Sequence, residues 1–277
     1  MGSVPAGDEE ADPVTSARPP VLLGTVAIEP NRWGAVRSGG FPVTVLSEWL
    51  PTIAAAGFGG LELWERHATF VDEHEVERIV RGPVPVVVFN SYALWDDPEP
   101  FARDEVARWV DRFGAAGVKF NVGNDAKARD VYVERLARFD EQLSPGVRLL
   151  CECHAGTLAE DPDLASAMFD EVAPAERLQA IVHLGRTPTD ETRAFMERLG
   201  DRVGHVHLQL AEEGPTTDPA SLAADLRIGA ELLRTFGFEG SWTIEFSHGL
   251  MTNRDEPGYI LEWASRDLRA LRDALGP

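Results

Sequence analysis

The sequence is short of basic residues and of long apolar runs. Its 277 residues include 26 Lys and Arg against 46 Asp and Glu, which gives a formal net charge of −20. A protein that binds duplex nucleic acid needs a basic surface to neutralise the phosphates. No Lys/Arg run would build one here, so we expect no nucleic acid partner. No segment offers about 18 uncharged apolar residues in a row, so we expect no membrane span.

Cysteine is equally scarce, since the chain has only Cys151 and Cys153. On a strand, residues two apart share a face, so both thiols point away from the face that carries Glu152. Two thiols so close on one strand are poorly placed for a disulfide and too few for a structural zinc site. We interpret them as small buried apolar residues, which allows a reducing, cytoplasmic location.

Residues 1–19 are polar, acidic and contain several prolines. They lack the apolar stretch of a signal peptide, so we predict a disordered tail. Residues 20–277 show no linker and no shift in composition, and we predict that they form a single domain.

Across these residues, eight short apolar runs alternate with longer amphipathic stretches. We predict strands at Val21–Ala27, Gly60–Trp64, Val84–Phe89, Val118–Val122, Val147–Glu152, Leu178–His183, Val203–Leu208 and Trp242–Phe246. We predict helices at Val43–Ala56, Asp104–Ala116, Tyr132–Leu143, Leu164–Val172, Thr189–Leu199, Leu222–Phe236 and Ile260–Leu275. Several of the predicted helices end in a glycine just before the next strand, and Gly57–Gly60 is one example. Strands that alternate with helices form a parallel sheet, and eight such units predict an α/β fold, a (β/α)8 TIM barrel. A doubly wound open sheet is the alternative.

In a parallel barrel, functional side chains lie at the carboxyl ends of the strands. Six of the seven histidines fall at these predicted ends. The polar residues there are Glu62, Glu65, His67, Asn90, Lys119, Asn121, Glu152, His154, His183, Arg186, His205, His207, Glu245 and His248.

Four of these residues, at the tips of strands five to eight, predict a divalent metal site: Glu152, His183, His207 and Glu245. Two oxygen and two nitrogen donors favour Mn²⁺, Fe²⁺, Co²⁺ or Zn²⁺ over Mg²⁺ or Ca²⁺, which prefer oxygen shells. A structural salt bridge is the alternative for Glu152. His205 shares the face of His207 but lies further from the mouth, so we interpret it as a supporting or core residue.

Two further charged residues have open interpretations. Arg186 is suited to a substrate carboxylate, phosphate or hydroxyl, or to a surface acid. Lys119 lies inside a barrel strand and needs a partner, which is Glu62, Glu152 or the substrate. The candidate apolar walls for a small ligand are Trp33, Trp64, Tyr92 and Trp95.

The segments GFGGLELWERH, LLCECHAGTLAED, GHVHLQL and GFEGSWTIEF carry a resemblance to a known family. The chain resembles the sugar phosphate isomerase/epimerase superfamily, the xylose-isomerase-like TIM barrels, over most of 20–277. The resemblance implies one divalent metal, often manganese, held by Glu, Asp, His and Glu from strands five to eight. Glu152, His207 and Glu245 match that pattern. His183 stands where the family usually has Asp, and Arg186 stands where a His usually follows three residues later.

The resemblance also implies a function, the isomerisation or epimerisation of a small keto-sugar or polyhydroxylated ketone through an enediolate. The two glutamates would move the proton next to the carbonyl. The residues expected to bind substrate are His154, Arg186, Glu62, His67 and Lys119. We expect Mn²⁺ as the cofactor and a carbohydrate-like substrate, and a homo-oligomer remains open. The alternatives are a lyase or dehydratase of the same superfamily, acting by inosose-type dehydration or C-glycoside cleavage, and a metal-free binding barrel.

Overall fold

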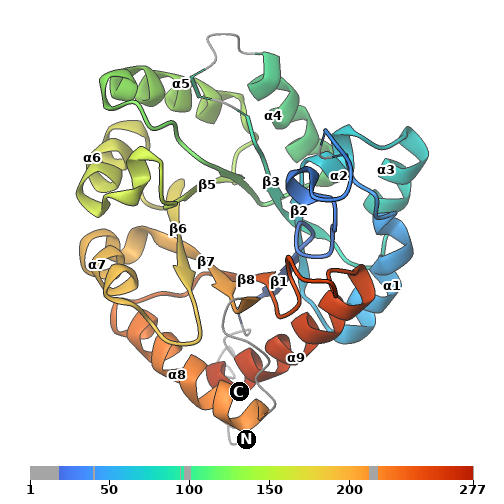
Figure 1. Cartoon of the computed structure of the whole chain (residues 1–277). Coiled ribbons are helices and arrows are strands. Elements are labelled where there is room, and N and C mark those ends of the chain that lie inside the picture. The colour runs from blue at the N-terminus through green and yellow to red at the C-terminus, as the bar shows by residue number, and fades with distance from the viewer. Residues whose placement is uncertain (1–18, 40, 94, 97–100, 212–217, 277) are drawn as a thin grey trace, which may run out of the picture.

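The structure is a computed structural model that describes residues 19–39, 41–93, 95–96, 101–211 and 218–276. Eight parallel strands close into a barrel in the order β1 to β8, and helices surround it (Figure 1). The pairing of β1 with β8, with Leu22 opposite Thr243, completes the ring. The predicted (β/α)8 barrel is therefore confirmed, and the alternative of a doubly wound open sheet is wrong. Residues 1–18 of the predicted tail lie outside the described residues.

All eight predicted strands are present, with small differences at their ends. The strands are β1 Val21–Gly24, β2 Gly60–Trp64, β3 Val86–Asn90, β4 Gly117–Phe120, β5 Arg148–Glu152, β6 Leu178–Leu184, β7 Val203–Gln209 and β8 Ser241–Phe246. The first ends earlier than predicted because a turn, in which Ala27 N–H donates to the carbonyl of Gly24 at 3.0 Å, follows it directly. The apolar run therefore continues past the end of β1, so its length did not predict where the strand ends.

The helices occupy the predicted intervals, with one addition. They are α1 Leu46–Ala56, α2 Arg66–Thr69, α3 Glu73–Val80, α4 Phe101–Phe113, α5 Arg129–Gln142, α6 Pro162–Val172, α7 Asp190–Leu199, α8 Pro219–Thr235 and α9 Pro257–Leu275. Short 3₁₀ turns lie at Arg32–Gly34, Ala126–Ala128, Leu158–Glu160 and Gly200–Arg202. The interval that holds α2 and α3 was not among the predicted helices. The second of these begins at an N-cap, where Asp72 accepts from the N–H of Glu75, and it buries only Val76 and Ile79 among its apolar residues.

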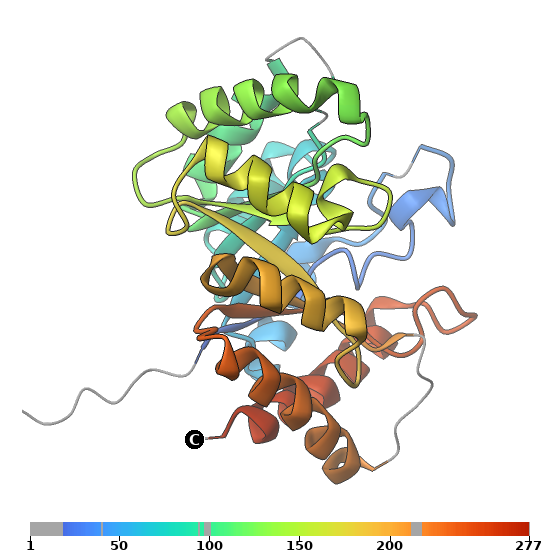
Figure 2. The same ribbon diagram turned by 90° about the vertical axis from the view of Figure 1, so that its left-hand side faces the viewer.

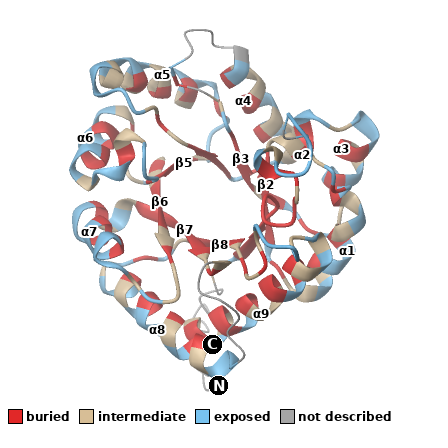
Figure 3. Ribbon diagram, viewed as in Figure 1, coloured by how far each residue is buried: buried red, intermediate tan, exposed pale blue. Residues whose placement is uncertain are grey.

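The strands are buried almost throughout, and two apolar regions lie on their two faces (Figure 3). Inside the barrel, Leu22, Val88, Leu150 and Ile181 pack together, whereas Cys151 belongs to the large core between strands and helices. Successive side chains of a strand point to opposite faces. The residue that follows Cys151 on β5, Glu152, therefore points into the barrel.

Both cysteines are free and buried, as predicted. Burial raises the pKa of each thiol well above its usual value, since a thiolate loses solvation in an apolar core. Gly57 follows α1 with a φ of 95°, so it makes the predicted turn between helix and strand.

The long segments after β1 and β8 project from one end of the barrel, away from the chain's C-terminus (Figure 2). This end carries the carboxyl ends of all the strands, because the strands are parallel. Within the described residues, no helix is long and apolar enough to cross a membrane.

Candidate metal centre and adjoining cavity

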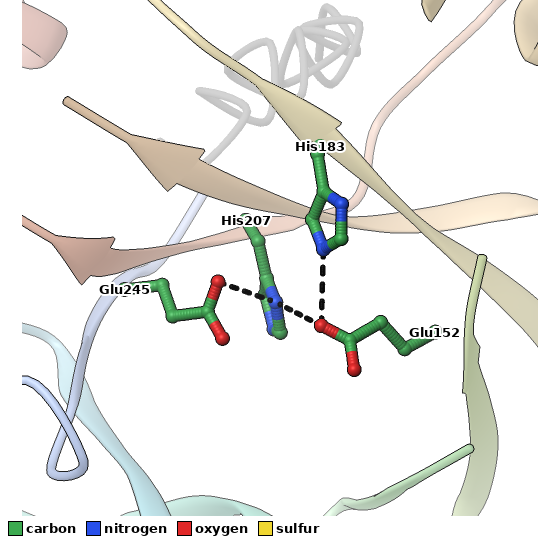
Figure 4. Close-up of side chains that lie close together, drawn as sticks. All are labelled: Glu152, His183, His207 and Glu245. Atoms are coloured by element: carbon green, nitrogen blue, oxygen red, sulfur yellow. Dashed lines mark hydrogen bonds and ion pairs between the residues drawn. The ribbon is translucent and has the colours of Figure 1, made fainter. Parts of the chain in front are cut away.

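The structure brings the four predicted metal ligands together at this end. One donor atom from each of Glu152, His183, His207 and Glu245 lies within 4.8 Å of the others (Figure 4). Nε2 of His183 is 3.0 Å from Oε1 of Glu152, and the rings of His183 and His207 stack with centroids 5.7 Å apart. We call these four residues the mouth cluster. Four strands supply one residue each, so the arrangement depends on barrel closure.

His207 shows that the mouth cluster is suited to a cation. Its Nε2 lies 3.0 Å from Oε2 of Glu62. Its buried Nδ1 lies 3.2 Å from both Glu152 Oε1 and Glu245 Oε2, yet it makes no hydrogen bond. A buried nitrogen without a partner costs free energy. Metal-binding histidines commonly donate one ring N–H to a carboxylate and aim the other nitrogen at the metal. The contacts of His207 with Glu62 on one side and the mouth cluster on the other are compatible with that arrangement.

The charges around His207 lead to the same conclusion. Burial alone would lower the pKa of His207, but the carboxylates of Glu245 and Glu62 raise it well above its usual value. Burial would raise the pKa of Glu152, but Lys119 and then His183 hold it well below its usual value. The site therefore concentrates negative charge that a proton or a metal cation on His207 would balance.

Lys119 is paired with Glu152 rather than with Glu62. Its buried Nζ lies 2.7 Å from Oε2 of Glu152 and 2.8 Å from Oδ1 of Asn121. Asn121 donates to the same Oε2 at 2.7 Å. The opposite oxygen, Oε1, is left facing the two histidines. Lys119 and Asn121 therefore fix the orientation of this carboxylate.

A second group, the inner network, lies one layer deeper and consists of Glu62, Asn90, His205, Ser241 and Thr243. The ring nitrogens of His205 lie 2.7 Å from Ser241 Oγ and 2.8 Å from Thr243 Oγ1. Glu62 accepts from Asn90 Nδ2 and from Thr243 Oγ1, each at 2.8 Å. The interpretation of His205 as a supporting core residue agrees with these contacts. The hydroxyl partners were missed because serine and threonine in a strand carry no distinctive signal.

A cavity of about 700 Å³ opens beside the mouth cluster. Of the residues predicted to contact substrate, His154 lines it, and so does the ligand candidate His183. Gln209 was missed, although it follows His207 by two positions and so shares its face. The full lining is Trp33, Cys153, His154, Ala155, His183, Gly185, Thr189, Glu191, Thr192, Phe195, Gln209, Ala211, Phe246, Leu250 and Met251.

Two other residues that were predicted to bind substrate contact side chains of the protein itself. Arg186 contacts Asp225 through Nε at 2.5 Å and Ser221 through Nη2 at 2.9 Å, both on α8. His67 is fully buried and contacts Thr25 at 3.0 Å and Glu29 at 3.3 Å. Neither residue lines the cavity, and their contacts with substrate stay predictions.

Among the predicted apolar walls, only Trp33 lines this cavity. Trp64 and Trp95 are almost fully buried, and Trp95 packs edge-on against Phe120. Tyr92 is partly exposed and lies with its ring 5.1 Å from the Lys119 ammonium. An aromatic residue near a strand end is therefore as readily a packing residue as a wall.

No protein-family model and no curated protein sequence matches this chain. Solved structures do match it. D-psicose 3-epimerase from Clostridium cellulolyticum is 12% identical with a TM-score of 0.66, covering 93% of this chain and 100% of its own. The 3-keto-D-glucoside 4-epimerase from E. coli is 14% identical with a TM-score of 0.58, covering 92% and 99%. Endonuclease IV from Thermus thermophilus is 13% identical with a TM-score of 0.57, covering 93% and 99%.

Identities this low show a shared fold and leave the reaction open. Two of the three structures are sugar epimerases, whereas the third is an endonuclease, for which the net charge of −20 is unsuitable. The comparisons thus support the resemblance to xylose-isomerase-like barrels at the level of the fold, and this chain has the (β/α)8 fold that these sugar epimerases share.

Proposed function

We propose that the protein is a divalent-metal-dependent isomerase or epimerase of a small keto-sugar or polyhydroxylated ketone, in the sugar phosphate isomerase/epimerase superfamily. The observation that carries the proposal is Nδ1 of His207, which makes no hydrogen bond and lies 3.2 Å from each of two carboxylates beside a cavity. A reducing cytoplasmic location, compatible with the free thiols of Cys151 and Cys153, is part of the proposal.

Glu152, His183, His207 and Glu245 would hold the cation, and their oxygen and nitrogen donors suit Mn²⁺. When bound, the cation supplies positive charge that stabilises the negative charge developing on the substrate oxygens in the enediolate. His183 adds a neutral donor where the resembled family has Asp, so this site carries one negative charge fewer.

The two glutamates would exchange the substrate proton, and their surroundings differ. Glu245 accepts a hydrogen bond from Gln209 at 2.8 Å, and its Oε2 lies 3.2 Å from Nδ1 of His207. Glu152 is held by Lys119 and Asn121. A carboxylate with fewer donors is the stronger base, because hydrogen bonds and cations stabilise its ionised form. Glu245 therefore takes the proton next to the carbonyl, and Glu152 acts on the opposite face of the substrate.

Other residues would orient the substrate. His154 and Gln209 reach the cavity and offer polar atoms to hydroxyl groups. Lys119 and Glu62 would act indirectly, the first through Glu152 and the second through His207. Arg186 and His67 stay as candidates for contacts with a larger ligand.

The test is proton exchange with solvent. The Mn²⁺-loaded protein is incubated with a panel of ketoses in D₂O, and deuterium at the carbon next to the carbonyl is measured by NMR. We expect exchange with at least one sugar and its loss in Glu245→Gln. In a parallel reaction in H₂O, a product of unchanged mass distinguishes isomerisation from elimination. Absence of deuterium for every sugar, in a protein that elemental analysis shows to hold metal, would contradict the proposal.

A further inference from the structure

The residues that line the cavity beside the mouth cluster are of two chemical kinds. His154, His183 and Gln209 offer polar atoms and include a candidate metal ligand. Large apolar residues from the segment after β1, from the end of β8 and from the segment after β8 also line it, namely Trp33, Phe246, Leu250 and Met251. We call these four residues the apolar wall. A free sugar, which carries hydroxyls on nearly every carbon, offers little surface to such a wall.

The apolar wall is exposed where a ligand would meet it. Trp33 is 56% exposed and Met251 is 63% exposed, although both are large and apolar. The Trp33 ring stands edge-on to that of Phe246, with centroids 5.9 Å apart. Large apolar side chains gathered around a cavity are typical of a binding surface, since water contacts them at a cost.

The same two exposed residues adopt an unfavourable backbone conformation. Trp33 has a φ of 60° and Met251 a φ of 58°, and these are the two non-glycine residues with positive φ in the described part of the chain. The left-handed region costs a residue with a side chain about 1 kcal/mol or more. Strain of this kind persists where surrounding contacts hold the backbone, and it gathers at ligand sites.

A partly buried ion pair contacts the backbone at both strained residues. Arg32, which precedes Trp33, is fully buried and contacts Asp255 through Nη1 at 2.5 Å and Nη2 at 3.1 Å. Its Nε donates to the carbonyl of Val26 at 2.6 Å. Asp255 in turn accepts from the N–H of Met251 at 2.8 Å. The pair joins the two segments that project together from the carboxyl end of the barrel (Figure 2). The apolar wall is therefore a preorganised surface.

We propose that the apolar wall is a subsite for a hydrophobic substituent, so that the substrate is a sugar derivative with an aromatic or alkyl aglycone. This inference rests on the proposed function, which places the sugar ring at the mouth cluster. The volume of about 700 Å³ agrees with it, because cavities of roughly 300–1,000 Å³ take ligands of drug size.

The test compares phenyl β-D-glucopyranoside with methyl β-D-glucopyranoside, binding each to the Mn²⁺-loaded protein by isothermal titration calorimetry. We expect the phenyl glucoside to bind at least about tenfold more tightly, because its ring gains an aromatic contact and leaves water. Trp33→Ala should reduce the preference to less than about threefold, and Met251→Ala should weaken it. Equal affinity of the two glucosides, or no binding of the phenyl compound, overturns the proposal.

The control is Ile228→Ala, which removes a 53% exposed apolar side chain on α8 outside the cavity lining. It should leave the preference unchanged, and an equal loss in this variant overturns the proposal. Thermal unfolding of each variant shows whether the fold is intact.

Titrations without Mn²⁺ separate this inference from the proposed function. If the mouth cluster binds no cation, Mn²⁺ leaves both affinities unchanged, while a phenyl preference that depends on Trp33 persists. If the apolar wall is no subsite, Mn²⁺ strengthens both glucosides equally and Trp33→Ala changes neither.

Discussion

The mouth cluster and the inner network both combine glutamate with histidine, and they differ in how the ring nitrogens of their histidines are hydrogen bonded. Donor atoms of Glu62, His205 and His207 also lie within 4.8 Å of one another. In the inner network, however, both ring nitrogens of His205 have hydroxyl partners. Burial also lowers the pKa of His205, although the nearby carboxylate of Glu62 acts against this. In the mouth cluster, Nδ1 of His207 has no hydrogen bond.

The difference shows that proximity of histidine and glutamate is a weak sign of a metal site. Buried polar groups with complete hydrogen bonding already have their partners within the protein. A nitrogen that makes no hydrogen bond but lies between two carboxylates beside a cavity is instead suited to share a cation with them. His207 belongs to both layers, since Glu62 holds its Nε2 and leaves Nδ1 toward the mouth.

The largest expected effect is the loss of metal from a mouth-cluster variant. Glu152→Gln removes a charged oxygen donor and should weaken Mn²⁺ binding at least about a hundredfold, measured by electron paramagnetic resonance titration. The control is Glu197→Gln, which neutralises an exposed glutamate on α7. Unchanged affinity in the Glu152 variant would remove the distinction between the two layers.

A smaller loss of affinity is expected from the inner network. Glu62→Gln keeps the shape of the side chain but weakens its hold on Nε2 of His207. Residues that orient a metal ligand typically contribute about 10- to 100-fold to affinity, so we expect about tenfold weaker Mn²⁺ binding. A loss as large as that of Glu152→Gln would indicate that Glu62 itself is a ligand.

A pair of histidine variants should separate stability from metal binding. His205→Leu leaves the hydroxyls of Ser241 and Thr243 without their partner, so we expect a loss of about 1–3 kcal/mol in the free energy of unfolding. His183→Leu, on a ring that is 25% exposed, should affect stability less and Mn²⁺ affinity more. Urea unfolding and metal titration of both variants measure this, and the reverse pattern would contradict the assignment.

The smallest expected effect concerns Asp267 on α9, a buried carboxyl that accepts a hydrogen bond from a hydroxyl rather than from a histidine. Burial raises its pKa to about 7, although the hydrogen bond from Ser247 and the charge of Arg266 act against this. A folded pKa above the unfolded value of 3.8 means that the folded state holds the proton more tightly. This contribution to stability is complete below about pH 4 and is lost as the pH rises through about 7.

Asp267→Asn should remove that dependence. Between about pH 6 and pH 8, the wild-type protein should lose about 1–2 kcal/mol of unfolding free energy relative to the variant, as measured by urea unfolding. Parallel curves for the two proteins would show that the carboxyl titrates alike in the folded and unfolded states.

Much of this arrangement could be predicted from the order of residues alone. Apolar runs alternating with amphipathic ones indicated the barrel, and side-chain alternation on β5 placed Cys151 outward and Glu152 inward. The parallel strands then required Glu152 and Glu245 to lie at the same end of the molecule. These inferences succeed because they depend on local periodicity and on one rule of topology.

The tertiary structure decided which side chains meet. Lys119 could equally have paired with Glu62, and nothing in the order of residues joins Arg32 to Asp255, which are 223 positions apart. Such pairs depend on the stagger between neighbouring strands and on the closure of β1 against β8. The paths of the loops after those strands set the apolar wall for the same reason. Local sequence determines the direction of a side chain along its own strand, but its partner comes from another part of the chain, and only the closed barrel brings the two within hydrogen-bonding distance.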